Sequence, residues 1–245
     1  MTAERVFGIH AVDGVLRKNP QRALRLLLQD QRRDKRLQAL ETLAHNQGIV
    51  TERLSREHLD ALVVGRHQGA VLEVTDDGGN LLDEAQLLAR VAQASNPLVL
   101  VLDGVTDPHN LGACLRSADA AGVTAVVVPK DRSADLTPVA RKVACGAAET
   151  LPYARVTNLA RILEQLQQAG LWVVGTAGEA ETLVYDQDLR GPMVLVMGAE
   201  GDGLRRLTRE HCDFLVKLPM AGLVSSLNVS VATGICLFEA VRQRR

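Results

Sequence analysis

A chain of 245 residues is long enough for one large or two medium domains, and its 47% apolar and 23% charged residues are ordinary globular values. These values exclude intrinsically disordered, fibrous and coiled-coil proteins. The formal net charge of −1 argues against a protein that holds nucleic acid by bulk electrostatics alone. With one Trp, two Tyr and three Phe, the chain also argues against RNA binding that depends mainly on base stacking.

The charge is unevenly distributed along the chain. Residues 1–75 contain 12 Lys and Arg against 9 Asp and Glu, a net charge of +3, whereas the remaining 16 basic and 20 acidic residues give −4. The N-terminal excess includes a run formed by Arg32, Arg33, Lys35 and Arg36. Such a run is most often a solvated helix face, and the less common alternative is a contact with RNA.

Membrane, export and metal-binding signals are missing from the sequence. No apolar stretch approaches the roughly 20 residues of a membrane span, and the N-terminus lacks the apolar core of a signal peptide. The four cysteines form no CxxC pair, and the histidines are scattered without ligand spacing. We therefore expect a cytoplasmic protein with no membrane contact and no metal.

Turn residues divide the chain in two. The segment TDDGGN (75–80) follows an apolar run at 70–74 and precedes a helical pattern that starts at 81. It predicts a small α/β domain at 1–74, a connector at 75–95 and a larger domain at 96–245. In the small domain the apolar spacing predicts an alternating order of strand 22–28, helix 35–46, strand 49–54 and helix 56–62.

The larger domain alternates more clearly between apolar runs and helical patterns. The predicted strands are 98–102, 123–128, 171–174, 193–197 and 215–218, and the predicted helices are 110–121, 137–148, 158–169 and 228–242. Continuous apolar runs joined by helices predict an α/β fold with a parallel sheet covered on both faces. In such sheets the sites lie at the carboxyl ends of the strands.

The first of three unusual loops begins at Asp103, after the first strand of this sheet. Asn110 is a good N-cap for the helix that follows, and Gly112 allows close approach of a backbone or a ligand. Arg116, further along the helix, could grip a phosphate near the helix N-terminus. The alternative is that Arg116 pairs with Asp103 or Asp119 and only stabilises the surface.

The second loop, GAEGDG at 198–203, follows an apolar strand and opens a helix. Its spacing is GxxGxG and not the GxGxxG of dinucleotide-binding proteins, and it lies in the last quarter of the chain. A nicotinamide-dependent dehydrogenase is therefore disfavoured. Gly198, Gly201 and Gly203 still indicate that the backbone approaches something closely.

The third loop, at 218–232, is a polar cluster between a strand and the long final helix. Ser226, Asn228 and Ser230 could all serve as helix caps, which would need no catalytic explanation. A serine nucleophile is not expected, because no GxSxG elbow surrounds these residues and no histidine is near them in sequence.

Taken together, the three loops resemble the signature motifs of the SPOUT class of methyltransferases, in its SpoU or TrmH-like branch of RNA ribose 2′-O-methyltransferases. The motifs are NLGACLR (110–116), VMGAEGDGL (196–204) and LPMAGLVSSLNVSVATG (218–234). The resemblance extends to the N-terminal domain, through VFGIHAV (6–12) and HQGAVLEV (67–74). Over its whole length the chain resembles the bacterial members that methylate a guanosine ribose in 23S rRNA.

This resemblance implies a fold and partners that periodicity could not predict. It implies a catalytic domain with a deep trefoil knot that holds S-adenosylmethionine, preceded by an RNA-binding domain like ribosomal protein L30e. It also implies a homodimer with the active site at the subunit interface, acting on 23S rRNA, in the peptidyl-transferase loop, or on a large-subunit precursor.

The resemblance also assigns residues by motif position. The cofactor pocket would be lined by Gly198, Leu218 and Leu227, with Met197, Ala199 and Met220 adjacent. The polar catalytic positions are matched by Asn110, Arg116, Glu200, Ser226 and Asn228. We expect the basic surface for RNA to comprise the run Arg32, Arg33, Lys35 and Arg36 together with Lys130, Arg132, Arg141 and Lys142.

The same motifs are compatible with two other interpretations. One is a sibling enzyme that methylates a tRNA ribose or another rRNA site. The other is a non-catalytic RNA-binding factor in ribosome assembly that keeps the fold without binding the cofactor.

Overall fold

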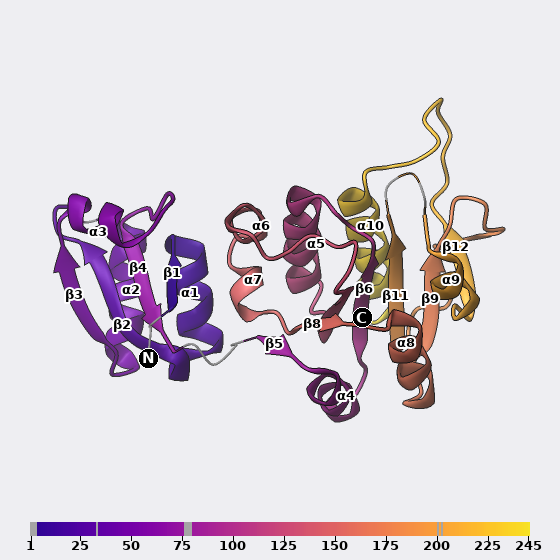
Figure 1. The fold of residues 1–245 in the computed structure, drawn as a ribbon, viewed down its shortest axis with the longest axis horizontal. Helices are drawn as coiled ribbons and strands as arrows, with labels where there is room; N and C mark the ends of the chain where they lie inside the picture. The colour runs from indigo at the N-terminus through magenta and orange to yellow at the C-terminus, as the bar shows by residue number, and fades with distance from the viewer. Residues whose placement is uncertain (1–3, 33, 76–79, 200, 202) are drawn as a thin grey trace. The chain divides into compact units, whose positions relative to one another are not determined.

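The computed structural model describes residues 4–32, 34–75, 80–199, 201 and 203–245 (Figure 1). The chain divides into two units: residues 1–80 with 145–150, and residues 81–144 with 151–245. Each unit has a sheet of its own.

The first unit is built on a four-stranded mixed sheet in the order β1-β4-β2-β3. β2 and β3 are parallel, whereas β4 runs antiparallel to both of its neighbours, β1 and β2. The predicted strand–helix–strand–helix order was therefore incomplete, because the apolar run at 70–74 forms a central antiparallel strand. The bounds are β1 Glu4–Phe7, α1 Ile9–Lys18, a 3-10 turn Pro20–Arg22, β2 Ala23–Gln29, α2 Lys35–Asn46, β3 Val50–Leu54, α3 Arg56–Leu62, β4 Ala70–Val74 and α7 Ala147–Thr150.

The second unit contains an eight-stranded sheet whose recorded strand pairs are all parallel, in the order β10-β12-β9-β11-β6-β7-β8-β5. This confirms the predicted α/β fold with a parallel sheet. Its strands are β5 Leu81–Leu82, β6 Leu98–Asp103, β7 Ala125–Pro129, β8 Tyr153–Val156, β9 Trp172–Thr176, β10 Thr182–Leu183, β11 Met193–Gly198 and β12 Phe214–Lys217. Its helices are α4 Glu84–Gln93, α5 Pro108–Ala120, α6 Pro138–Ala144, α8 Leu159–Gln168, α9 Arg206–Glu210 and α10 Val229–Gln243.

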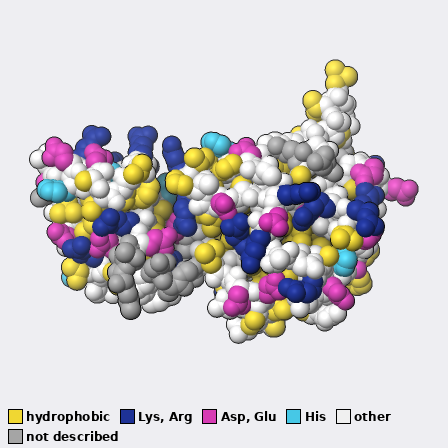
Figure 2. All heavy atoms as spheres, viewed as in Figure 1, with side chains coloured by type: hydrophobic (Ala, Val, Ile, Leu, Met, Phe, Trp, Pro, Cys, Tyr) yellow, Lys and Arg dark blue, Asp and Glu magenta, His cyan; other side chains and the backbone are white. Residues whose placement is uncertain are grey.

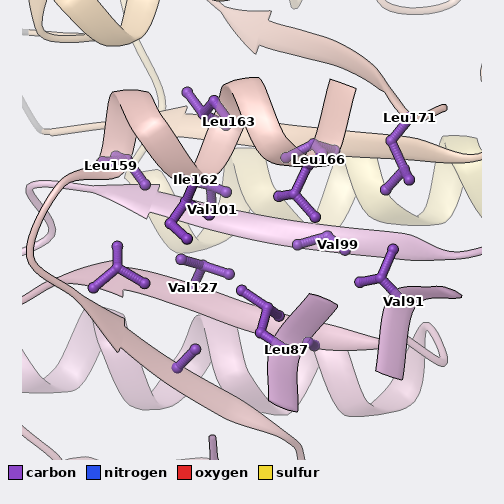
Figure 3. Close-up of a cluster of buried hydrophobic side chains, with 14 of the residues drawn as sticks. Leu87, Val91, Val99, Val101, Val127, Leu159, Ile162, Leu163, Leu166 and Leu171 are labelled. Carbon is purple, nitrogen blue, oxygen red and sulfur yellow. The ribbon is translucent and has the colours of Figure 1, made fainter. Parts of the chain in front are cut away.

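The core of this unit is formed by aliphatic side chains on both faces of the sheet. On one face, α4 and α8 pack against alternate residues of β6, including Val99 and Val101 (Figure 3). On the other, α10 packs against β11 and α5, and α5 packs against α6. Residues of β6 are fully or almost fully buried along the whole strand, which is why its sequence is a continuous apolar run.

Two predicted helix boundaries are wrong for local reasons. The segment predicted as one helix at 137–148 is split into α6 and α7, because Cys145 and Gly146 adopt positive φ angles of 52° and 95°. α5 begins at Pro108 and not at Asn110. Its N-cap is Asp107, whose carboxylate accepts a hydrogen bond from the backbone N–H of His109 at 2.8 Å.

No helix in the described part of the chain is long and apolar enough to cross a membrane. The predicted connector at 75–95 falls partly on residues 76–79, which lie outside the described residues; its remainder contains β5 and α4.

Candidate functional site

Two neighbouring strands meet where the strand order of the parallel sheet reverses. β6, β7 and β8 follow one another to one side, whereas β11 is inserted on the other side of β6 and pairs with it from Met193↔Leu98 to Gly198↔Asp103. The loops after β6 and β11 therefore leave the same edge of the sheet side by side. Such a reversal point is where open α/β sheets bind ligands.

The glycines of the loop after β11 allow its backbone to fold back on itself. Ala199 and Gly203 exchange two backbone hydrogen bonds of 3.0 and 3.1 Å. A Cβ atom on Gly198 would lie 2.3 Å from the carbonyl carbon of Gly203, so only glycine fits there. Gly201 and Gly203 have φ angles of +88° and +67°. The close approach predicted for these glycines is thus the return of their own loop.

A pocket of about 360 Å³, here called the apolar pocket, opens beside this loop. Most of its described lining residues are glycine or apolar, with a few hydroxyl and amide side chains and with Lys217 as the one charged residue. All six residues predicted to contact the cofactor line it, as do two of the predicted catalytic residues: Met197, Gly198, Ala199, Leu218, Met220 and Leu227, with Ser226 and Asn228.

A second pocket of about 460 Å³, here called the charged pocket, lies between the loops after β6 and β11. It shares Ala199, Gly203 and Val229 with the lining of the apolar pocket, so the two pockets adjoin. The rest of its lining is Asp103, Gly104, Val105, Thr106, Asp107, Asn110, Arg132 and Arg205.

A buried ion pair fixes the floor of the charged pocket. The side chain of Asp103 is fully buried at the end of β6 and pairs with the guanidinium of Arg205. It also accepts a hydrogen bond of 3.1 Å from the backbone N–H of Arg205. The carboxylate thereby holds the loop after β11 against β6. Asp103, one of the two carboxylates considered as a partner for Arg116, thus already has a cationic partner in Arg205.

Two predicted catalytic residues meet at the boundary between the pockets. Asn228 Nδ2 donates to Asn110 Oδ1 at 2.9 Å, which joins the start of α10 to the first turn of α5. Asn228 Oδ1 accepts from the backbone N–H of Ser230 at 2.9 Å and so caps α10, as the sequence allowed. Asn110 is 8% exposed. It lies within α5, whose N-cap is Asp107, so Asn110 does not have the capping role that its sequence position suggested.

Arg116 is the one described catalytic candidate that lies in neither pocket. Arg116 is exposed on α5, six residues beyond Asn110, and lines neither pocket. At 100° per residue the two side chains leave α5 in directions about 120° apart. Glu200 lies outside the described residues.

Comparisons with known proteins identify the family to which the chain belongs. The profile of the SpoU rRNA Methylase family matches residues 97–238, more than half of the chain. The chain belongs to the SpoU rRNA methylase family. A second profile, described as RNA 2′-O ribose methyltransferase substrate binding, matches residues 5–77 of this SpoU methylase.

Relatives of this SpoU methylase match it along its full length. It is 63% identical over 244 residues to the 23S rRNA (guanosine-2′-O-)-methyltransferase RlmB of Pseudomonas putida, covering 99% of this chain and 97% of the relative. It is 56% identical over 243 residues to RlmB of Escherichia coli K12, covering 99% of both chains.

A solved structure supports the same relationship. The crystal structure of the SpoU methyltransferase AviRb from Streptomyces viridochromogenes, in complex with the cofactor AdoMet, has a TM-score of 0.75 and 27% sequence identity to this SpoU methylase. The similarity covers 99% of this chain and 90% of AviRb.

The basic residues predicted to contact RNA fall into two groups, one in each unit of the SpoU methylase. In the first unit, Arg32 pairs with Asp34 at 2.7 Å and donates to the backbone carbonyl of Gln68 at 2.9 Å, so part of its charge is locally compensated. Lys35 and Arg36 are exposed in the first turn of α2, and Arg33 lies outside the described residues.

In the second unit, Lys130 and Arg132 are exposed on the loop after β7, and Lys142 is exposed on α6. Arg141 is half-buried and donates to the backbone carbonyl of Leu136 at 3.2 Å. Figure 2 shows basic and acidic side chains interspersed over this unit, without one continuous basic face in that view.

In the charged lining of the second pocket, sequence reasoning named Arg132 as an RNA contact but did not bring it together with Asp103, Asp107 and Arg205. Arg205 contacts Asp103 across 102 positions, and no local spacing connects the two. Asp107 precedes Pro108, and this pair was a local signal for a helix start. Within the described ranges, no three His, Cys, Asp or Glu side chains come together to hold a metal ion.

One cysteine in the apolar pocket is unreactive near neutral pH. Cys236 is 1% exposed on α10, and burial raises the pKa of its thiol to about 12. It therefore stays protonated near neutral pH and contributes packing and not nucleophilic chemistry.

Proposed function

We propose that this protein transfers a methyl group from S-adenosylmethionine to the ribose 2′-hydroxyl of a guanosine in 23S rRNA. The observation that carries the proposal is the pair of adjoining pockets joined at the Asn110–Asn228 contact. They lie in a chain 56–63% identical, over its full length, to enzymes that carry out this reaction.

The residues of the apolar pocket fit S-adenosylmethionine. Its volume of about 360 Å³ lies in the range of pockets for small molecules, about 300–1,000 Å³. Met197, Met220, Leu218 and Leu227 offer apolar contacts for an adenine ring. The described residues of the loop, Gly198, Ala199, Gly201 and Gly203, bring main-chain amides and carbonyls to the rim on small side chains or none. When bound there, S-adenosylmethionine supplies an electrophilic methyl group carried on a sulfonium.

The residues at the boundary of the pockets orient the ribose. A ribose 2′-hydroxyl is a very weak acid, so holding its oxygen in line with the methyl group supplies much of the rate enhancement. Asn110 and Asn228 hold each other in place through their mutual hydrogen bond, and Ser226 adds a hydroxyl from the adjacent loop. These three side chains position the hydroxyl and hydrogen-bond to its oxygen.

Arg116 stabilises the negative charge that develops on the ribose oxygen. It is not a literal base, because a guanidinium keeps its proton up to about pH 12. Oriented by the phosphate of the target nucleotide, it lowers the energy of the alkoxide electrostatically, and the proton passes to solvent. Glu200 is assigned to the catalytic group by its motif position alone.

The site is completed by a second subunit. Arg116 points away from Asn110 on the same helix, so the pocket of one subunit receives the partner subunit's Arg116. Exposed apolar side chains suit such a homodimer. Val231 and Phe238, seven residues apart on α10, are 51% and 48% exposed, and Leu223 and Val224, in the segment before α10, are also exposed.

The finer fold assignments follow from the same family. After β12 the chain returns to α10, which packs against both α5 and β11, a path that suits a C-terminal trefoil knot. The first unit, with its mixed four-stranded sheet, takes the role of an L30e-like domain that binds the substrate RNA. The domains proposed are residues 1–74 and 96–245, with 75–95 as the connector. Basic residues in both units contribute the phosphate contacts.

The proposal is tested with the purified protein, labelled S-adenosylmethionine and a 23S rRNA transcript or precursor particle. Nucleoside mass spectrometry should detect one 2′-O-methylguanosine per RNA, in the peptidyl-transferase loop. Methylation of tRNA or of another rRNA ribose would favour a sibling enzyme. Failure to bind the cofactor at all would favour a non-catalytic assembly factor.

The role of Arg116 needs its own comparison. Arg116→Ala and Arg116→Lys should both lower the rate of methyl transfer by at least about a hundredfold, because Lys cannot reproduce the bidentate, planar contact. RNA binding should change little. Substantial activity in either variant, with RNA binding unchanged, would contradict this role.

A further inference from the structure

We infer that the charged pocket binds the guanine base of the target nucleotide, with Asp107 and Arg132 reading its two hydrogen-bonding edges. This inference rests on the proposed function, because the ribose must lie at the boundary of the two pockets. It adds what the motifs and relatives leave open, namely how this chain recognises the base.

The position of the charged pocket matches that of a base attached to the reacting ribose. It adjoins the apolar pocket through Ala199, Gly203 and Val229. The Asn110–Asn228 hydrogen bond lies at the junction, with Asn110 in one lining and Asn228 in the other. A ribose held at this junction, with its 2′-oxygen facing the apolar pocket, directs its base into the charged pocket.

Two side chains of the charged pocket have hydrogen-bonding capacity to spare. One carboxylate oxygen of Asp107 accepts from the backbone N–H of His109, and the other carboxylate oxygen has no partner among the described residues. The Arg132 guanidinium has neither a hydrogen bond nor an ion pair within the described ranges. By contrast, Asp103 and Arg205 already neutralise each other.

This arrangement is complementary to guanine. Guanine presents two donors, N1–H and the N2 amino group, on one edge and two acceptors, O6 and N7, on another. A carboxylate accepts from the first edge, and a guanidinium donates bidentately to the second. Adenine carries an acceptor at N1 and an amino group at C6, so the carboxylate contact would fail and the guanidinium would keep only its bond to N7. A bare phosphate would meet the carboxylates of Asp103 and Asp107.

The backbone at Arg132 is consistent with a built site. Arg132 has a φ angle of +57°, one of three positive values among the described residues other than glycine. Such a conformation is costly for a residue with a Cβ atom and persists where surrounding structure holds it. Here it belongs to the loop that places the guanidinium in the lining of the charged pocket.

The test measures kcat/KM for methyl transfer to RNA in which the target guanosine is replaced by inosine, 7-deazaguanosine or adenosine. Inosine lacks the N2 amino group, so the wild-type protein should use it about tenfold less well. Asp107→Asn should lower kcat/KM on guanosine by about 10- to 100-fold, remove the penalty for inosine and narrow the preference over adenosine. Asn is also a good N-cap, so α5 should stay folded in this variant.

The second contact is tested with 7-deazaguanosine, which lacks the N7 acceptor. The wild-type protein should have a kcat/KM about tenfold lower on 7-deazaguanosine than on guanosine. Arg132→Ala should have the same kcat/KM on both substrates. Asp188→Asn, in an exposed pair with Arg190, is the matched control and should keep wild-type discrimination.

A binding measurement separates this inference from the proposed function. The same RNAs are titrated against the protein saturated with S-adenosylhomocysteine. If the wild-type protein binds guanosine RNA more tightly than inosine RNA and Asp107→Asn does not, the result would support guanine recognition by the charged pocket, even if no methyl group were transferred. Equal transfer to guanosine, inosine and adenosine, unaffected by Asp107→Asn, would overturn the pocket and leave the proposed function standing. Neither transfer nor discrimination in binding would overturn both.

Discussion

The substitution Gly198→Ala tests how the loop after β11 shapes the pocket that it lines. A methyl group at this position would lie 2.3 Å from the carbonyl carbon of Gly203, 2.5 Å from its oxygen and 2.5 Å from the backbone nitrogen of Leu204. All three are backbone atoms, so the strain cannot be relieved by rotating a side chain. The loop has to move away from β11.

The cost follows from overpacking and from the loss of the loop's own bridge. Inserting a methylene-sized group into a packed site costs about 1–3 kcal/mol. Opening the Ala199–Gly203 bridge removes two hydrogen bonds of 3.0 and 3.1 Å, each worth about 1 kcal/mol. If about 2 kcal/mol of this appears as lost cofactor affinity, the Kd for S-adenosylmethionine rises about 30-fold.

Isothermal titration calorimetry with S-adenosylmethionine measures the affinity, and urea unfolding measures the accompanying loss of stability. Gly191→Ala is the control, because its added methyl group would meet nothing within 4 Å and its φ angle is not positive. A Gly198→Ala protein with wild-type affinity and wild-type stability would refute the assignment of this loop to the cofactor pocket.

Three further predictions concern stability and reactivity. Asp103→Asn removes the charge that pairs with the guanidinium of Arg205, and it should lower the free energy of unfolding in urea titrations by about 2 kcal/mol. The loss is smaller than for a fully buried pair because the Arg205 side chain is 40% exposed. Asp188→Asn, at an exposed pair, should change the free energy of unfolding by less than about 0.5 kcal/mol, and equal effects of the two variants would contradict the structure. Burial raises the pKa of Cys236 to about 12, above its unfolded value near 9. The stability that this thiol contributes is therefore present below pH 9 and is lost as the pH rises from about 9 towards 12, and Cys236→Ala should reduce that loss by up to about 1 kcal/mol per pH unit. An unchanged pH dependence of the unfolding free energy above pH 9 in this variant would contradict the burial of the thiol. Cys145 is exposed whereas Cys236 is buried, so a maleimide reagent should label Cys145 first at neutral pH, as peptide mass spectrometry can show.

Much of the fold was predictable because single residues mark the ends of its elements. The helix predicted at 56–62 has those bounds, with the Ser55 side chain capping its N-terminus. Pairing partners were not predictable from local patterns. β5 and β10 have two residues each and exist only because they pair with β8 and β12, and the antiparallel return of β4 depends on contacts far along the chain.

The apolar lining of the site was predictable, whereas in its charged part the sequence pointed to Arg132 but not to the pairing of Asp103 with Arg205. The resemblance of the motifs at 196–204 and 218–234 to the SpoU branch gave the residues that line the apolar pocket. The partnership of Asp103 with Arg205 joins loops that are distant in sequence and adjacent only because β11 pairs with β6. Asn110 is not the N-cap of α5, because the helix already begins at Pro108, a residue typical of the first helical position.

The central claim is tested most directly by mapping ribose methylation across rRNA and tRNA in cells from which the gene has been deleted. The account predicts the loss of one 2′-O-methylguanosine in the peptidyl-transferase loop of 23S rRNA, restored by the wild-type gene and not by one carrying Arg116→Ala. Unchanged rRNA methylation together with a change in tRNA would contradict it.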